Sequence, residues 1–400
     1  MSPQNLQASA VKLTRTFANA LLIVAAKLLW PRARPSDPRR VCIYRIGNIG
    51  DMVCAIPAMR AVRHAYPRAH LTLVTSPGKA GAVGARELLG GVEWIDEIVA
   101  YHSEEIATWH GRLQLLRRLR AHKFDVWIEL PADLAALATQ VRNMMVARAA
   151  GARWGFGWRR GWIQIAVNAQ TASVEFPDEV VRLLELVGNA GFVARDDDFQ
   201  LDITEPERRS ATRLLDQVGV VATEVVALAP GAKRATNRWP AERFAEVARH
   251  LAERGAAIIV LGGDSDAPVC EQIARAVGRG AISLAGRTTV RETCAVLARS
   301  TLLVCNDSGV QHLAAAVGTP CVSIFSRRAF LRTWWPHGVG HEVLWKEIDC
   351  HTCFLDSCPY DNKCINLISA FEVSGAADRV LDRELRAREV SSGPRAARIA

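Results

Sequence analysis

From Val41 onward, short runs of β-branched and other apolar residues alternate with longer stretches whose apolar positions recur at helical spacing. This alternation predicts parallel sheets built from βαβ units. In the first half of the chain the pattern predicts strands at 41–45, 70–76 and 124–130, with helices at 53–66, 104–122 and 132–149.

The same alternating pattern recurs in the second half, where we expect strands at 224–230, 256–263, 281–286, 301–306 and 321–325. The chain is therefore expected to be an α/β protein with two Rossmann-like, doubly wound domains facing each other across a cleft. The predicted parts are an extension at 1–40, a first domain at 41–200, a linker region at 201–222, a second domain at 223–370, and a helix with a basic tail at 371–400. Ligands of open α/β sheets bind outside the carboxyl ends of the strands, so the loops after those strands are where candidate sites are sought.

The net charge of +9 over 400 residues raises the question of a nucleic-acid partner. The excess of Lys and Arg is concentrated in residues 1–40 and in the tail from Asp378, whereas the body between is nearly neutral. Because no basic stripe interleaved with aromatic residues runs through that body, we predict no nucleic-acid partner.

The basic N-terminal extension surrounds the apolar segment "FANALLIVAAKLLW". Its charge-free part, from Thr16 to Ala26, is well short of the roughly 20 residues that span a bilayer. A secretory signal peptide and a solvated extension are two interpretations, although Lys27 and the following "WPRARP" are poor cleavage-site chemistry. We favour the third, a basic amphipathic helix lying on an anionic membrane surface.

Asp51 is the candidate acid of the first domain. It follows the strand at 41–45 and the glycine-rich turn in "RIGNIGDMV". If the ligand is a nucleotide sugar, the reaction needs a base that takes the proton of an acceptor hydroxyl, and Asp51 is the candidate for that base. The same position also permits Asp51 to cap the helix that follows, and the two roles are compatible. Arg45 and Asn48, in the same stretch, are the candidate acceptor-binding residues.

Three loops of the second domain carry groups suited to a phosphate-bearing ligand. The loop "APGAKRATNRWP" places Lys233 and Arg238 near a helix start, where cations can form an anion site. Taken alone, the loop fits a solvated basic loop equally well. In "LGGDSDAP", Asp264 is placed to accept from ribose hydroxyls or to cap the next helix.

The third loop, "CNDSGVQHLAAAVGTP", is the most specific of the three. Asp307, Ser308 and Gly309 lie at a strand-to-helix turn, where backbone N–H groups and the helix dipole favour a diphosphate. His312 lies one helical turn beyond Ser308 on the same face. A histidine on a helix is often structural, but in this loop we expect a ligand contact.

Ten cysteines fall into two groups. Six stand singly in apolar segments and are expected to be buried free thiols. The other four, Cys350, Cys353, Cys358 and Cys364, have a spacing compatible with a structural zinc site. Reduced thiols packing a loop are the alternative interpretation.

These motifs together resemble glycosyltransferase family 9, the lipopolysaccharide heptosyltransferases. The resemblance covers about residues 41–366 and rests on "YRIGNIGDMVCAIPAMRAVRHAYPRAHLTLVT", "APGAKRATNRWPAERFAEVARHL", "AGRTT" and "LLVCNDSGVQHLAAAVGTPCVSIF". It implies a GT-B fold and an inverting transfer that needs no metal or other cofactor. It also implies ADP-heptose as donor and a lipid-linked core oligosaccharide as acceptor, at the cytoplasmic face of the inner membrane.

Carried over by position, the resemblance implies that Asp51 is the catalytic base. It further implies donor contacts from Lys233, Arg238, Asp264, Asp307, Ser308, Gly309 and His312. The chain departs from the family where members often carry Lys and this chain has Asn237, and where Ser308 replaces the usual Thr. Two alternatives stay open: a family 9-like transferase using another nucleotide sugar for capsule or O-antigen assembly, and a catalytically silent nucleotide-sugar-binding protein.

Overall fold

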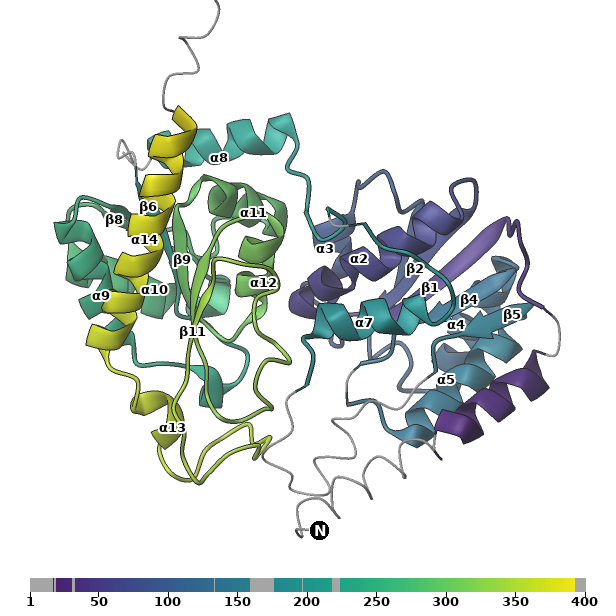
Figure 1. Cartoon of the computed structure of the whole chain (residues 1–400). Coiled ribbons are helices and arrows are strands. Elements are labelled where there is room, and N and C mark those ends of the chain that lie inside the picture. The colour runs from purple at the N-terminus through teal and green to yellow at the C-terminus, as the bar shows by residue number, and fades with distance from the viewer. Residues whose placement is uncertain are drawn as a thin grey trace, which may run out of the picture. The chain divides into compact units, whose positions relative to one another are not determined.

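The structure, a computed structural model, describes residues 17, 19–30, 33–132, 134–158, 176–195, 197–217 and 224–392. The chain divides into two compact units, each built around its own sheet (Figure 1). Unit 1 comprises Met1–Phe199 and Phe330–Trp334, and unit 2 comprises Gln200–Ala329 and Trp335–Ala400. The division into two Rossmann-like α/β units is as predicted from the sequence.

Unit 1 contains a five-stranded parallel sheet of order β3-β2-β1-β4-β5. Its strands are β1 (Arg40–Ile46), β2 (His70–Ser76), β3 (Glu97–Ala100), β4 (Val126–Glu129) and β5 (Trp154–Phe156). Its helices are α2 (Ile49–Ala65), α3 (Ala85–Leu89), α4 (Trp109–Ala121), α5 (Leu137–Ala149) and α7 (Glu179–Gly188). The central strands β1 and β4 are almost wholly buried, as parallel strands covered by helices on both faces are.

Unit 2 contains a six-stranded parallel sheet of order β11-β10-β9-β6-β7-β8. Its strands are β6 (Val225–Ala229), β7 (Ala257–Val260), β8 (Ala281–Ser283), β9 (Leu302–Asn306), β10 (Cys321–Ile324) and β11 (Glu342–Leu344). Its α-helices are α8 (Glu205–Gln217), α9 (Ala241–Glu253), α10 (Ala267–Val277), α11 (Val290–Arg299), α12 (Gly309–Ala316), α13 (Lys363–Asn366) and α14 (Ala370–Ser392). The 3₁₀ turns η1 (Ala235–Asn237) and η2 (Asp264–Asp266) follow β6 and β7.

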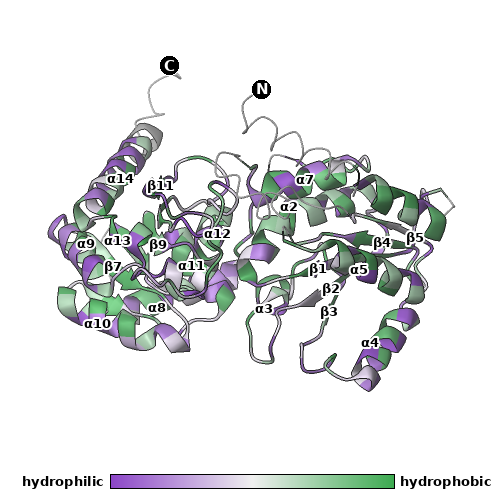
Figure 2. Ribbon diagram, turned by 90° about the horizontal axis from the view of Figure 1, so that it is seen from below, coloured by the Kyte–Doolittle hydropathy of each residue, from purple (hydrophilic) through white to green (hydrophobic). Residues whose placement is uncertain are grey.

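Hydropathy accounts for how the helices pack on these sheets. Both α4 and α14 carry hydrophilic as well as hydrophobic residues in Figure 2. Val373, Ala377 and Val380 of α14 are fully buried in the core of unit 2, while its polar positions face away. This division is what a helix needs when one face covers a sheet and the other meets water.

Three features differ from the sequence prediction. The strands β3, β5 and β11 were not predicted, because each is short and only partly buried. The region predicted as a linker contains α8. An ion pair joins this helix to α11, with Arg291 Nε 2.7 Å from Glu207 Oε1. Finally, Phe330–Trp334 returns to unit 1, where the Thr333 carbonyl accepts a hydrogen bond from the Glu179 N–H at the start of α7.

The N-terminal helix, residues 19–29, is part of the fold of unit 1. Leu22 is buried in the same core cluster as Trp127 and Met144, and so is Trp30 just after the helix. The Trp30 ring stacks on Trp158 with centroids 4.8 Å apart, and its indole N–H donates to the Ala152 carbonyl at 2.8 Å. Among the residues that the structure describes, no helix is long and apolar enough to cross a bilayer.

Replacing Trp30 by Ala tests whether this helix stabilises unit 1. The change removes the ring stack and a buried hydrogen bond, so we expect it to lower the free energy of unfolding by about 3 kcal/mol, measured by urea denaturation. Leu28→Ala, on the solvent side of the same helix, is the matched control and is expected to change it by less than about 0.5 kcal/mol. Equal effects of the two substitutions would contradict this packing.

Candidate active site

Asp51 lies in the first turn of α2, directly beyond the carboxyl end of β1. Its Oδ2 accepts a hydrogen bond from the Asn48 N–H at 3.0 Å, so the carboxylate caps the helix as one interpretation of the sequence expects. A Cβ added to Gly47 would lie 2.3 Å from the Asp51 Cβ, so this loop needs glycine there. The Asp51 side chain is 21% exposed, which leaves the carboxylate accessible from solvent.

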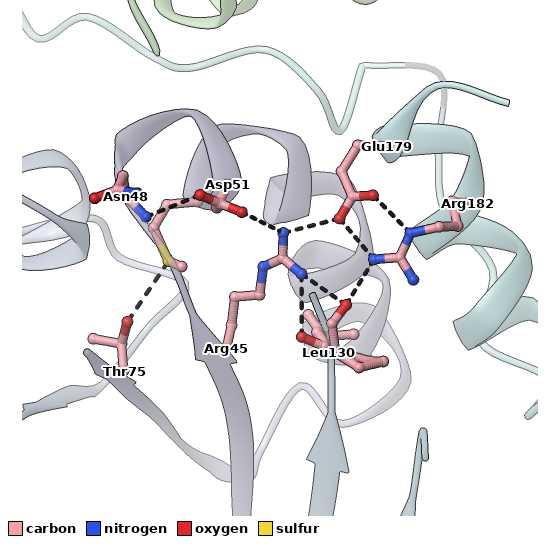
Figure 3. Close-up of polar contacts among 9 residues, drawn as sticks. Arg45, Asn48, Asp51, Thr75, Leu130, Glu179 and Arg182 are labelled. Carbon is pink, nitrogen blue, oxygen red and sulfur yellow. Dashed lines mark hydrogen bonds and ion pairs between the residues drawn. The ribbon is translucent and has the colours of Figure 1, made fainter. Parts of the chain in front are cut away.

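Arg45, the other predicted acceptor-binding residue beside Asn48, lies inside unit 1. Its side chain is completely buried, and Figure 3 shows its guanidinium between Asp51 and Glu179. Nη1 donates to the carbonyls of Leu130 at 3.2 Å and Pro131 at 2.9 Å. The guanidinium thus contacts Asp51 from inside unit 1, and the acceptor role of Arg45 stays a prediction. Asn48 is partly exposed at the start of α2, and its acceptor role stays a prediction.

Glu179, at the start of α7, is a member of this site that sequence reasoning missed. Its buried carboxylate accepts from Arg45 Nη2 at 2.9 Å and from Arg182 Nε at 2.6 Å. Burial opposes its ionisation, but Arg182 and Arg45 outweigh burial and hold the pKa of Glu179 below its usual value. No spacing in the sequence links Glu179 with Asp51, because the two lie in different βα segments that only the fold brings together.

In unit 2, Asp307 and Asn237 connect the loops after β9 and β6. The Asn237 amide nitrogen donates to Asp307 Oδ2 at 2.8 Å, and its amide oxygen accepts from the Ser326 hydroxyl at 2.8 Å. Gln311, one turn into α12, donates to Asp307 Oδ1 at 3.4 Å. Burial raises the pKa of Asp307 to about 6, although Arg328, Asn237 and Gln311 act in the opposite direction. Asp307 therefore titrates closer to neutral pH than an ordinary aspartate.

The remaining predicted residues of this loop surround the start of α12. Ser308 is the N-cap residue, and its buried hydroxyl oxygen has no hydrogen-bond partner within the described part of the chain. Gly309 is the first residue of the helix. His312 is only 3% exposed, so its ring lies inside unit 2 rather than on an open surface.

The predicted cations lie on the neighbouring loop after β6. Lys233 is exposed, and Arg238 is half exposed, with its Nε donating to the Ala232 carbonyl at 2.8 Å and Nη2 lying 3.9 Å from Asp266. Asp264 is exposed after β7. Its carboxylate lies over Gly286 of the "AGRTT" segment, where the positive φ of 70° and a Cβ clash at 2.4 Å both require glycine. The fold thus brings the loops after β6, β7 and β9 to the same edge of one sheet.

The four-cysteine segment lines a cavity of about 640 Å³ in unit 2. Besides Cys350, Cys353, Cys358 and Cys364, the lining includes Arg328 and Lys363. All four are free thiols. In the described ranges of the chain, no three His, Cys, Asp or Glu side chains are grouped as a metal ion would need. A structural zinc at these cysteines therefore stays a prediction.

Comparison with known proteins identifies the family. The family model described as glycosyltransferase family 9 (heptosyltransferase) matches residues 112–364, more than half of the chain. The chain belongs to glycosyltransferase family 9. It is therefore a glycosyltransferase, as the motifs of both units predict.

Individual members of family 9 resemble the chain over most of its length. It is 27% identical to lipopolysaccharide heptosyltransferase 3 of Escherichia coli over 71% of this chain and 82% of that protein. The glycosyltransferase family 9 protein of Veillonella parvula superposes with a TM-score of 0.71 at 20% identity, covering 88% of this chain and all of that one (100%). The E. coli ADP-heptose lipopolysaccharide heptosyltransferase II superposes with a TM-score of 0.61 at 21% identity, covering 86% and 99%. The predicted GT-B fold is confirmed.

Replacing Asp307 by Asn tests the electrostatics of the β9 loop. Protonation of Asp307 is favoured by folding, so its stabilising contribution is present at low pH and is lost as the pH rises through about 6. Asp307→Asn is therefore expected to gain stability relative to the wild type between pH 5 and pH 8, by roughly 1 kcal/mol, measured by urea denaturation. Glu253→Gln, an exposed acid of the same unit, is the control and should show no such gain. A difference that is the same at both pH values would show that Asp307 titrates normally.

Proposed function

We propose that this glycosyltransferase moves a heptose from ADP-heptose to a hydroxyl of a lipopolysaccharide core or related glycolipid acceptor, with inversion and without a metal. Membership of family 9 supports the heptosyl donor, and relatives such as the E. coli heptosyltransferase 3 are named for lipopolysaccharide. The observation that carries the proposal is the partly exposed Asp51 carboxylate, fixed at the carboxyl edge of the unit 1 sheet.

In the proposed reaction, Asp51 accepts the proton of the acceptor hydroxyl. The hydroxyl oxygen then forms a bond to the anomeric carbon, while the bond from that carbon to the diphosphate breaks and its electron pair leaves with ADP. A single displacement of this kind inverts the anomeric configuration. The base contributes by proton transfer, and positive groups contribute by stabilising the charge on the departing diphosphate.

Donor binding is proposed for the loops after β6, β7 and β9 in unit 2. The N-terminus of α12 offers backbone N–H groups, and the Ser308 hydroxyl lacks a partner within the described chain. Arg238 and Lys233 supply exposed positive charge on the adjacent loop. Asp264, after β7, is proposed to contact the nucleoside, and His312, in the first turn of α12, to contact the donor diphosphate.

Two other functions would use the same fold. A family 9-like transferase with another nucleotide sugar would keep Asp51 and differ in the donor it binds. A silent nucleotide-sugar-binding protein would keep the unit 2 loops but would have no need for a partly exposed carboxylate in the first turn of α2. The position of Asp51 therefore favours an active enzyme.

Asp51→Asn tests the base role directly. It keeps the shape of the side chain but removes the proton acceptor, so turnover is expected to fall at least about 100-fold while ADP affinity, measured by calorimetry without added metal, stays unchanged. Glu87→Gln is the matched control, because Glu87 also caps the first turn of a unit 1 helix, accepting from the Gly84 N–H at 2.8 Å. The control should turn over normally. Near-normal turnover of Asp51→Asn would remove Asp51 from the base role.

A peripheral position on the cytoplasmic face of the inner membrane is also part of the proposal. The outer face of the N-terminal helix presents Phe17, Leu21, Val24 and Leu28, which are 77%, 52%, 53% and 78% exposed. Their spacing of four, three and four residues places them in one stripe, with exposed Lys27 beside it. An apolar stripe flanked by cations suits the interface of an anionic bilayer. Because the opposite face is packed in the core, the helix would bring unit 1 with it.

Charged substitutions in the stripe test this membrane contact. The double variant Leu21→Asp, Leu28→Asp is expected to lose at least about tenfold in binding to phosphatidylglycerol vesicles, measured by sedimentation, because charge replaces apolar contact with the interface. Val193→Asp, at a unit 1 position that is 75% exposed, is the control and should bind like the wild type. Unchanged vesicle binding of the double variant would contradict the proposal.

A further inference from the structure

Arg45 connects Asp51 with buried groups in the interior of unit 1. Its Nη2 lies 3.3 Å from Asp51 Oδ1 and 2.9 Å from Glu179 Oε1, so one nitrogen serves two carboxylates (Figure 3). Nη1 is held by the backbone carbonyls beyond β4. With both ends of the guanidinium fixed, its position determines where a donor N–H meets the Asp51 carboxylate.

Glu179 is held in turn by Arg182. Arg182 donates from Nε to Oε2 at 2.6 Å and from Nη2 to Oε1 at 2.7 Å, and Nη2 also donates to the Pro131 carbonyl at 2.6 Å. Pro131 thus accepts from both arginines. Two cations and two carboxylates balance when Asp51 is ionised, which is the arrangement that burial of Arg45 and Glu179 requires.

An arginine next to a catalytic base has two opposite effects. It fixes the carboxylate in place, but its positive charge stabilises the ionised form and so weakens the base. A second carboxylate on the same guanidinium nitrogen offsets that charge. In this site Glu179 is nearer to the shared nitrogen than Asp51 is, so it takes the larger share of the interaction.

We propose that Glu179 and Arg182 are positioning residues for the transfer reaction: they orient Arg45 toward Asp51 and set how readily Asp51 accepts a proton. This inference rests on the proposed role of Asp51 as the base. Neither residue touches the substrate in this scheme. Both act through Arg45.

Among the residues that the structure describes, further titratable groups near this site come from α2, β4 and the start of α7. They are Cys54 of α2, Glu129 of β4 and Asp178, the N-cap of α7. Burial, with Glu179 and Asp51, raises the pKa of the Cys54 thiol well above its usual value, so it stays neutral. Burial raises the pKa of Glu129 to about 7, so its titration falls on the neutral part of a pH profile. Asp307 of unit 2, whose pKa burial raises to about 6, also titrates on the acid side, so the test compares the acid limb between variants, and its movement on changing Glu179 or Arg182 is what reports on Asp51.

The test compares the pH dependence of kcat/KM for the wild type, Glu179→Gln and Arg182→Gln. Removing the negative charge of Glu179 makes Asp51 ionise more readily, so the acid limb should move to lower pH by roughly one unit, with a plateau kcat about tenfold lower. Removing the positive charge of Arg182 should move the limb to higher pH. A purely structural role would lower the amount of active enzyme in both variants but would move neither limb.

Two further variants, together with thermal unfolding and ADP affinity, make the outcome decisive. Glu179→Asp keeps the charge and should restore the limb of the wild type even if kcat stays low. Asp96→Asn, which breaks the ion pair of Asp96 with Arg63 at 2.5 Å elsewhere in unit 1, should leave the limb unmoved. Should Glu179→Gln fail to fold, as judged by thermal unfolding, the upward shift in Arg182→Gln decides. ADP affinity should be unchanged throughout.

The inference and the proposed base role fail in different ways. If Asp51→Asn abolishes turnover and the acid limbs of both charge variants overlap that of the wild type, the positioning role is wrong and the base role stands. If Asp51→Asn retains turnover, the base role is wrong and the positioning inference is overturned with it.

Discussion

The strand order of the two parallel sheets determines where Asp51, Asn237 and Asp307 lie, because each follows one of the strands that flank the point where that order reverses. In unit 1 the chain passes from β1 to β2 on one side and later places β4 on the other, and in unit 2 it does the same with β6, β7 and β9. Within each sheet, the loops that follow the two adjacent central strands therefore lead away from each other, and a ligand can bind between them. These strands are β1 and β4 in unit 1 and β6 and β9 in unit 2. In each unit a polar side chain bridges this gap: Arg45 reaches the loop after β4, and Asn237 reaches the loop after β9.

Arg45 and Asn237 differ in how their buried polar groups are compensated. Arg45 is a fully buried cation, and such a charge is stable only when carbonyls and carboxylates surround it. Glu179 and Arg182 belong to that set, so the Asp51 carboxylate is joined to a charge network that extends to α7. Asn237 is neutral: its amide nitrogen donates to the carboxylate and the backbone carbonyl of Asp307, and its amide oxygen accepts from the Ser326 hydroxyl. Unit 1 thus fixes its carboxylate through an ion pair, whereas in unit 2 neutral amides donate hydrogen bonds to Asp307 and the charges of Arg328 and Arg234 act on it as well.

The sequence predicts the central strands and their loops because buried parallel strands are continuous apolar runs, as in β1, β6 and β9. It does not predict the edge strand β11, whose residues are all only partly buried. Asp51, Asp307 and Ser308 can be proposed from the sequence because they lie in the loop or first helical turn that follows a central strand. Glu179 cannot be, because its contact with Arg45 joins residues 134 positions apart in the sequence, and its local pairing with Arg182, three residues along α7, is an ordinary helix-surface spacing that indicates no site. The buried state of Arg45 was missed for the same reason.

Asn237 shows why a departure from the family pattern changes the chemistry of its neighbour. Where members of the family often carry Lys, an ammonium beside Asp307 would hold the carboxylate ionised. The Asn237 amide supplies a hydrogen bond but no charge, and the pKa of Asp307 is raised to about 6. If the donor diphosphate binds at this loop as proposed, a carboxylate that is more easily neutralised repels it less. Positive charge that acts on Asp307 comes from Arg328 and Arg234. Asp356 pairs with both arginines, so the segment that carries the four cysteines also fixes the charge around the β9 loop.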